Sequence, residues 1–282
     1  MKLSVSRLHA THNDFLVTVV APDAAPPDAA TARAVCDRAH SGGGADGLIA
    51  LLPGTDGADC AMELRNADGE LAEMSGNGIR CLAWVAVRDQ LARGDQLTVA
   101  TAAGTRTLTL DIDPTSGYLR SATVDMGAAT FVPAAIPVDA PSADDIAFDL
   151  DGVEYRGTAC GMGNPHWVIL GADPASINLG QVGPVLECDS RFKNRTNVEF
   201  ARVIDQFTIV MRAWERGVGE TQSCGTGACA VAAVAHRAGL VDSRMTVRVP
   251  GGELVVEVGD TILLGGPVVH LGDEIIDLKR GG

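Results

Sequence analysis

Short runs in which apolar and polar residues alternate dominate the chain. Clear examples are Gln96–Ala100, Arg106–Ile112, Asn197–Val203 and Glu253–Val258. Alternation places successive side chains on opposite faces of a strand, and Gly, Asp or Pro residues punctuate the runs. The pattern predicts half-exposed antiparallel strands along most of the chain. Further strands are expected at Gly47–Leu52, Trp167–Leu170, Phe207–Arg212 and Met245–Val249.

Only three stretches have the periodicity of a helix. Ala29–His40 is amphipathic and is expected to lie on the surface. Asn77–Leu91 and Gly227–Leu240 are apolar nearly all round and rich in small residues. A helix of that composition is typically buried. The sequence therefore predicts two buried helices among many strands.

The length of 282 residues suits two domains of ordinary size. Two stretches rich in Ala, Pro and Asp, Ala21–Ala30 and Val132–Asp145, have the composition of surface connections. The second lies near mid-chain and marks the expected boundary. We expect an N-terminal half over residues 1–128 and a C-terminal half over 129–269, with the last strand, in 270–282, returning to the first half.

The overall charge narrows the choice of partners. The formal net charge is −14 and the isoelectric point is about 4.7. Lysine occurs only at Lys2, Lys193 and Lys279, so no lysine-based basic patch can form. Nucleic acid and anionic membranes are therefore not expected as partners. No apolar run approaches the ~18 residues of a membrane span, and polar residues interrupt the first twenty positions, so we expect a cytoplasmic protein.

The cysteines indicate neither a disulfide framework nor a structural metal site. There are seven, an odd number, in a chain of ordinary size. No C-x-x-C pair occurs, although such pairs are the usual spacing of zinc ligands. We therefore expect free thiols, no metal and no disulfide, in keeping with a reducing compartment.

The entrances of the two predicted buried helices resemble each other. One contains Ser75-Gly76-Asn77-Gly78 and the other Cys224-Gly225-Thr226-Gly227. The first N–H groups of a helix have no internal partner and carry partial positive charge, and glycine lets an anion approach them closely. A single such turn would be an ordinary capping turn. Two copies, each preceded by a small nucleophile-type residue, predict two similar halves that share one carboxylate-binding site.

These motifs resemble the two signatures of the diaminopimelate epimerase family. Ser75-Gly76-Asn77-Gly78-Ile79-Arg80-Cys81 is similar to the first signature, in which the family has cysteine at the position of Ser75. Glu215-Arg216-Gly217 with Thr221-Gln222-Ser223-Cys224-Gly225-Thr226-Gly227 is similar to the second. Other matches follow the family's order along nearly the whole chain: His12-Asn13-Asp14-Phe15, Asn66-Ala67-Asp68-Gly69, Gly163-Asn164-Pro165-His166 and Thr196-Asn197-Val198.

The resemblance implies an α+β fold of two pseudo-symmetric domains, each a mostly antiparallel sheet wrapped around one central helix, with substrate bound between them. It also implies conversion of LL-2,6-diaminopimelate to the meso form by two-base proton transfer, without pyridoxal phosphate, other cofactors or metal. This reaction serves lysine and peptidoglycan precursor synthesis. A homodimer would be in keeping with the family.

The resemblance further assigns roles to individual residues. Cys224 is one of the two proton-transferring residues, and Ser75 stands where the other would be. His166 and Glu215 support the acid–base chemistry, with Asp14 near them. The residues implied in substrate binding are Asn13, Asn66, Gly76, Asn77, Asn164, Asn197, Glu215, Arg216, Gly225 and Thr226. The Gly-bearing entrances would hold the reacting α-carboxylate, whereas Asn66, Asn164, Asn197 and Arg216 would bind the distal amino-acid end.

Two positions depart from the family's pattern. A serine hydroxyl is far less acidic than a thiol, which at a helix entrance is expected to have a lowered pKa. Ser75 therefore has three interpretations: an acid–base group assisted by His166, a substitution that slows or abolishes turnover while preserving binding, or an engineered change. At Gly47 some members carry glutamine. Cys81 is expected to lie six residues into the helix, in packing, and not to replace the missing cysteine.

Two other functions stay open from the residues alone. One is racemisation, epimerisation or dehydration of another amino acid on the same fold. The other is amino-acid binding with low or no activity, because of Ser75. The retention of Asn66, Asn164, Asn197 and Arg216 favours a substrate with two amino-acid ends, and hence diaminopimelate.

Overall fold

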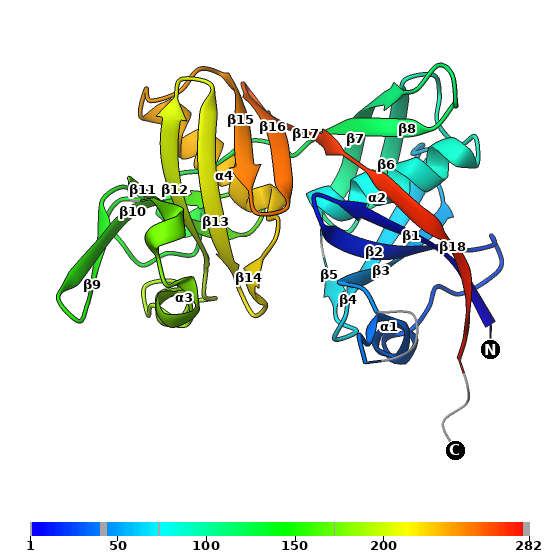
Figure 1. The fold of residues 1–282 in the computed structure, drawn as a ribbon, viewed down its shortest axis with the longest axis horizontal. Coiled ribbons are helices and arrows are strands. Elements are labelled where there is room, and N and C mark those ends of the chain that lie inside the picture. The colour runs from blue at the N-terminus through cyan, green and yellow to red at the C-terminus, as the bar shows by residue number, and fades with distance from the viewer. Residues whose placement is uncertain (1, 40–43, 73, 172, 279–282) are drawn as a thin grey trace. The chain divides into compact units, whose positions relative to one another are not determined.

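The computed structural model describes residues 2–39, 44–72, 74–171 and 173–278. The chain divides into two compact units: unit 1 comprises Met1–Val124 with Gly266–Gly282, and unit 2 comprises Asp125–Gly265. Each unit contains one long helix among its strands (Figure 1). In the described part of the chain, no helix is both long and apolar enough to cross a membrane.

Unit 1 is built on a chain of paired strands in the order β18-β1-β2-β3-β4-β6-β7-β8, with β5 paired to β4. Pairing is antiparallel except between β2 and β3 and between β4 and β6. Parallel neighbours need a crossover connection, and helices α1 and α2 lie in these two connections. The elements are β1 (Lys2–Ala10), β2 (Asn13–Val19), α1 (Ala29–Cys36), β3 (Gly47–Pro53), β4 (Cys60–Asn66), β5 (Leu71–Ala72), α2 (Gly76–Arg88), β6 (Gln96–Thr101), β7 (Gly104–Ile112), β8 (Leu119–Asp125) and β18 (Val269–Asp277).

Unit 2 repeats this arrangement strand for strand. Its order is β9-β10-β11-β12-β13-β15-β16-β17, with β14 paired to β13 and parallel pairs at β11–β12 and β13–β15. The predicted fold class, two similar α+β halves of mostly antiparallel strands, is confirmed. The elements are η1 (Pro133–Ala135), β9 (Ile146–Leu150), β10 (Val153–Gly161), β11 (Pro165–Leu170), η2 (Pro174–Ser176), α3 (Leu179–Glu187), β12 (Asn197–Asp205), β13 (Thr208–Glu215), β14 (Gly219–Thr221), α4 (Gly225–Arg237), β15 (Arg244–Val249), β16 (Gly252–Val258) and β17 (Ile262–Pro267).

The two long helices are the buried centres of their units. Helix α2 packs against β1 to β4, and α4 packs against strands on both sides of β12. Every residue from Gly227 to Ala235 is buried, and most of these side chains are small, so the strands can approach α4 closely. Both helices end about three residues before the predicted ends. Gln90 (φ 60°) and Gly239 (φ 71°) adopt left-handed conformations just past the C-caps, which terminates a helix.

The remaining helices differ from expectation. Helix α1 ends at Cys36, because Asp37 is extended (ψ 114°), rather than continuing to residue 40, which lies outside the described residues. Helix α3 is not anticipated by the sequence analysis, because Gly183 and Pro184 lie inside it. A Cβ on Gly183 would lie 2.4 Å from the Trp214 ring, so glycine allows α3 to rest directly on Trp214.

Candidate active-site residues in each unit

Cys224 stands at the entrance of α4 in unit 2. It is the N-cap residue, with extended backbone (φ −112°, ψ 108°), and only 3% of its surface is exposed. The Cys224 Sγ lies 3.7 Å from the Thr226 hydroxyl. The N–H groups of Gly225 and Thr226 belong to the first helical turn, which offers donors to an anion.

The environment of Cys224 raises the pKa of its thiol well above 9.0, and burial is the main cause. The negative charges of Glu215 and Glu199 act in the same direction, whereas the Gly227 N–H and the Thr226 hydroxyl lower the pKa by a smaller amount. The expectation that the helix entrance lowers this pKa is wrong, since desolvation and two carboxylates outweigh the helix terminus. Cys224 is consequently a protonated thiol at neutral pH.

Glu215, the last residue of β13, lies beside this thiol and interacts with it. Its Oε1 accepts a hydrogen bond of 2.5 Å from the Thr221 hydroxyl. A further hydrogen bond to Cys224 favours the ionised carboxylate, but burial outweighs both and raises the pKa of Glu215. A carboxyl group with a raised pKa beside a thiol with a raised pKa can exchange a proton with it.

His166 is completely buried, and its two ring nitrogens face Glu199 and Asn164. Its Nδ1 lies 2.6 Å from Glu199 Oε1 and its Nε2 lies 2.8 Å from Asn164 Oδ1. The Asn164 Nδ2 donates to the Thr226 hydroxyl over 3.4 Å. His166 thus reaches the neighbourhood of the thiol through Asn164 and Thr226.

Sequence reasoning missed Glu199. Its place in the alternating run of β12 is compatible with a solvent-facing residue, but Glu199 has no exposed surface. The signal that could have identified it is the position of β12 in the middle of its sheet, where both faces are covered. A charged residue in such a strand is buried and therefore needs a partner.

Asn197 and Arg216 form a local structure at the ends of β12 and β13. The Asn197 Nδ2 donates to the Pro165 carbonyl over 3.0 Å, and its Oδ1 accepts from the Arg216 backbone N–H over 2.8 Å. The guanidinium of Arg216 donates to the Asn194 carbonyl over 3.1 Å. Asn197 therefore positions the segment that presents Arg216, whose side chain is exposed.

Ser75 has the corresponding place in unit 1, as N-cap of α2. Its Oγ accepts a hydrogen bond of 3.0 Å from the Gly78 N–H, and its backbone is extended (φ −139°, ψ 118°). Gly76 and Asn77 are buried in the first turn. The hydroxyl keeps its proton available for donation, because it acts as the acceptor in the cap.

A chain of amide and charged groups surrounds the α2 entrance. The Asn77 Nδ2 donates to Asn13 Oδ1 over 3.2 Å, and the Asn13 Nδ2 donates to Asp46 over 2.5 Å. Buried Arg80 donates to Asn77 Oδ1 over 2.7 Å. Asn13 and Asn77 are thus held together at the α2 entrance. Asp14 pairs with Arg38 at 2.6 Å, and Asn66, the last residue of β4, is exposed.

Four of the other cysteines are buried thiols. Burial raises the pKa of Cys36, Cys60, Cys81 and Cys160 to about 12. Cys81 is completely buried inside α2, as predicted. Within the described ranges, no three His, Cys, Asp or Glu side chains are grouped so that they could hold a metal ion.

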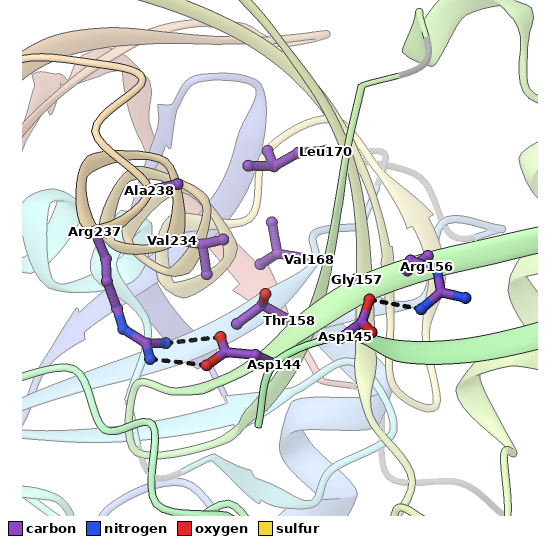
Figure 2. A pocket seen from close by; sticks show the side chains of 10 residues that line it. All are labelled: Asp144, Asp145, Arg156, Gly157, Thr158, Val168, Leu170, Val234, Arg237 and Ala238. Atoms are coloured by element: carbon purple, nitrogen blue, oxygen red, sulfur yellow. Dashed lines mark hydrogen bonds and ion pairs between the residues drawn. The ribbon is translucent and has the colours of Figure 1, made fainter. Parts of the chain in front are cut away.

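A pocket of about 390 Å³ lies at the other end of α4, beside Val234, Arg237 and Ala238 (Figure 2). Arg237 and Asp144 form two hydrogen bonds of 2.8–2.9 Å there, and Arg156 pairs with Asp145 at 2.6 Å. Helix α4 has 13 residues, so this pocket is about 20 Å from Cys224. These four charges are paired with each other, so the pocket lacks the free charges that would bind an amino acid.

The comparisons with known proteins agree with the two signatures. The family described as diaminopimelate epimerase matches residues 5–132 and 158–270. A diaminopimelate epimerase of Desulforudis audaxviator is 41% identical over 98% of this chain and 99% of its own length. One from Methanothermobacter thermautotrophicus is 37% identical over 90% of this chain and 89% of its own.

Solved structures share the fold at much lower identity. A probable proline racemase from Agrobacterium radiobacter has a TM-score of 0.72 at 16% identity and covers 98% of this chain and 93% of its own. A predicted epimerase from Pseudomonas aeruginosa has a TM-score of 0.67 at 20% identity, over 99% of this chain and 100% of its own.

Proposed function

Because the chain belongs to the diaminopimelate epimerase family, we propose that it interconverts LL- and meso-2,6-diaminopimelate, an isomerisation that supplies lysine and peptidoglycan precursor synthesis. Two observations together support the proposal. The family match extends over most of the chain, and the Cys224 thiol lies beside the Glu215 carboxyl group at the α4 entrance. The retained Asn164, Asn197 and Arg216 suit a substrate with a second amino-acid end.

In the proposed reaction, one group removes the α-proton and a second group delivers a proton to the opposite face. Cys224 is one of the two groups, and Glu215 exchanges a proton with it. Ser75 is the other, so its poor acidity makes its proton transfer the slow step. The negative charge that develops on the substrate carboxylate is stabilised by N–H groups at Gly76, Asn77, Gly225 and Thr226.

The proposal needs no pyridoxal phosphate. That cofactor is normally bound through a lysine Schiff base, and the chain has three lysines. Lys2 and Lys193 are exposed and are not among the residues around Cys224 or Ser75. Backbone donors at the helix entrances would take over the stabilisation that the cofactor's electron sink provides elsewhere.

We also propose that the protein acts in the cytoplasm and forms a homodimer. All seven cysteines are free thiols, which suits a reducing compartment. Val269, Leu271 and Ile275 of β18 are 43%, 57% and 67% exposed, and such apolar positions favour self-association. Sedimentation of the protein and of Leu271→Glu tests the dimer, since a monomer in both would refute it.

The activity is tested by incubating LL-diaminopimelate with the protein in D₂O and following the α-proton by NMR. Loss of the α-proton signal together with appearance of the meso isomer is the expected result. The variant Cys224→Ala is the control and is expected to show neither. Absence of exchange in both the natural chain and Ser75→Cys, with the proteins folded, would overturn the proposal.

A further inference from the structure

The two helix entrances differ in the side chain that packs against the third residue of the helix. A Cβ added to Gly78 of α2 would lie 3.2 Å from the Ile49 Cδ1, a methyl group. A Cβ added to Gly227 of α4 would lie 2.8 Å from the Glu199 Oε1, a carboxylate oxygen. Ile49 lies on β3 and Glu199 on β12, and these strands have the same place in the two units. The carboxylate at this place is therefore specific to the cysteine-bearing unit.

The Glu199 carboxylate is buried and only partly hydrogen-bonded. It has no exposed surface, and its Oε2 accepts no hydrogen bond from any residue that the structure describes. A buried carboxylate that is incompletely hydrogen-bonded is costly unless a positive charge adjoins it. The His166 Nδ1 lies 2.6 Å from Oε1, and a protonated ring would supply that charge.

Both ring nitrogens of His166 have a hydrogen-bond partner. Nδ1 faces a carboxylate oxygen and Nε2 faces the amide oxygen of Asn164 at 2.8 Å, so both ring nitrogens face acceptors. A ring with an acceptor on each side can donate a hydrogen bond from both nitrogens only as an imidazolium. The amide of Asn164 is thereby fixed with Oδ1 toward His166 and Nδ2 toward Thr226, whose hydroxyl lies 3.7 Å from the Cys224 Sγ.

We propose that Glu199 is a positioning residue: it holds His166 as an imidazolium, and this imidazolium locks the Asn164 amide with its N–H donors directed toward the Thr226–Cys224 end. An amide locked in this way donates to a carboxylate oxygen of the substrate. With a neutral histidine the amide could rotate by half a turn, present its oxygen instead and favour an ammonium group. Glu199 thus acts on substrate orientation without touching substrate. The expected effect on turnover rests on the proposed function, whereas the state of His166 does not.

The first test reads His166 directly in the resting protein. In ¹⁵N-labelled protein near neutral pH, two-dimensional NMR is expected to show both His166 ring nitrogens at the shifts of protonated nitrogens, with the signals assigned by their loss in His166→Gln. In Glu199→Gln, one nitrogen is expected to move to the shift of an unprotonated nitrogen. A neutral ring in the natural chain, or an imidazolium that survives Glu199→Gln, would overturn the proposal.

The second test separates charge from shape. Glu199→Gln keeps the shape without the charge, and Glu199→Asp keeps the charge on a shorter side chain. We expect Glu199→Gln to lower kcat/KM by about 10- to 100-fold, the range typical of residues that orient a functional histidine. Glu199→Asp is expected to keep the imidazolium and recover part of the activity. Equal losses in both variants, with a neutral ring in both, would show that the carboxylate only fills space.

The matched control removes another buried carboxylate from the same unit. Asp189 is 6% exposed and pairs with Arg191, away from Cys224. Asp189→Asn is expected to lower stability while leaving the His166 signals and kcat/KM unchanged, and a loss like that of Glu199→Gln would overturn the proposal. If Glu199→Gln does not fold, the natural chain and Glu199→Asp decide the outcome by NMR. If the natural chain and Ser75→Cys both lack epimerase activity, the proposed function fails but the NMR result stands.

Discussion

The Ser75 hydroxyl caps helix α2 by accepting a hydrogen bond of 3.0 Å from the Gly78 N–H. Serine is among the best N-cap residues, whereas the equivalent Cys224 makes no cap hydrogen bond through its side chain. The substitution at position 75 therefore improves the helix end and weakens the acid–base group. At position 75, serine favours the stability of the helix, whereas cysteine favours proton transfer.

This opposition predicts that Ser75→Cys makes a faster but less stable protein. Turnover is expected to rise by about 10²- to 10⁴-fold, the contribution of a well-matched acid–base group. Loss of the cap is expected to cost about 0.5–2 kcal/mol in the free energy of unfolding. Deuterium exchange and urea unfolding measure the two effects. Ser75→Ala is the control, since it should lose the stability without gaining the activity; a Ser75→Cys variant no faster than Ser75→Ala would contradict the assignment of Ser75.

The pKa of Cys224 is expected to fall when Glu215 is neutralised. Burial raises this pKa first, and the negative charge of Glu215 raises it further. In Glu215→Gln the charge disappears while the burial persists, so the thiol should ionise at a lower pH than in the natural chain. The thiolate absorbance near 240 nm, measured against pH and corrected with a Cys224→Ala background, follows the titration. An unchanged or higher midpoint would show that the carboxylate does not act on this thiol.

The buried thiols predict a loss of stability at alkaline pH. Burial raises the pKa of Cys36, Cys60, Cys81 and Cys160 from 9.0 to about 12. Below pH 9 the thiols are protonated in both states, so their contribution is intact. Between about pH 9 and 12 only the unfolded chain releases these protons, which lowers the free energy of unfolding by about 1.4 kcal/mol per pH unit for each thiol. The slope is therefore expected to be several kcal/mol per pH unit.

Urea unfolding under reducing conditions at several values between pH 8 and pH 10.5 measures this slope. Replacing one buried thiol, as in Cys160→Ala, should make the slope shallower by one thiol's share, despite lower stability at pH 8. Cys188 is exposed, and Cys188→Ala should leave the slope unchanged. A stability that does not fall above pH 9 would mean that the buried thiols ionise without unfolding.

The sequence predicted the fold more completely than it predicted the electrostatics of the site. The paired entrances at Ser75 and Cys224 are local patterns, and they predicted two similar halves with buried central helices. Helix α3 was missed because its stability comes from packing of Leu179, Val182 and Leu186 and from contact of Gly183 with Trp214, which local propensity does not encode. Glu199 and the raised pKa of Cys224 were missed for the same reason. Both depend on burial, which is set by strands distant in the sequence.

A final prediction uses the difference between the two helix entrances. Alanine is better than glycine inside a helix by about 1 kcal/mol. At Gly78 the added methyl would meet the Ile49 Cδ1 and the Ser75 Cβ, both at 3.2 Å, and the end of an isoleucine side chain can move by a few tenths of an ångström.

At Gly227 the added methyl would meet the Glu199 Oε1 at 2.8 Å and the Cys224 Sγ at 3.1 Å, and Glu199 is held by His166. We therefore expect Gly78→Ala to leave the free energy of unfolding within about 1 kcal/mol of the natural chain, and Gly227→Ala to lower it by about 1–3 kcal/mol, the usual cost of overpacking. Urea unfolding at neutral pH measures both. Equal effects in the two variants would mean that the Glu199 carboxylate is free to move away from α4.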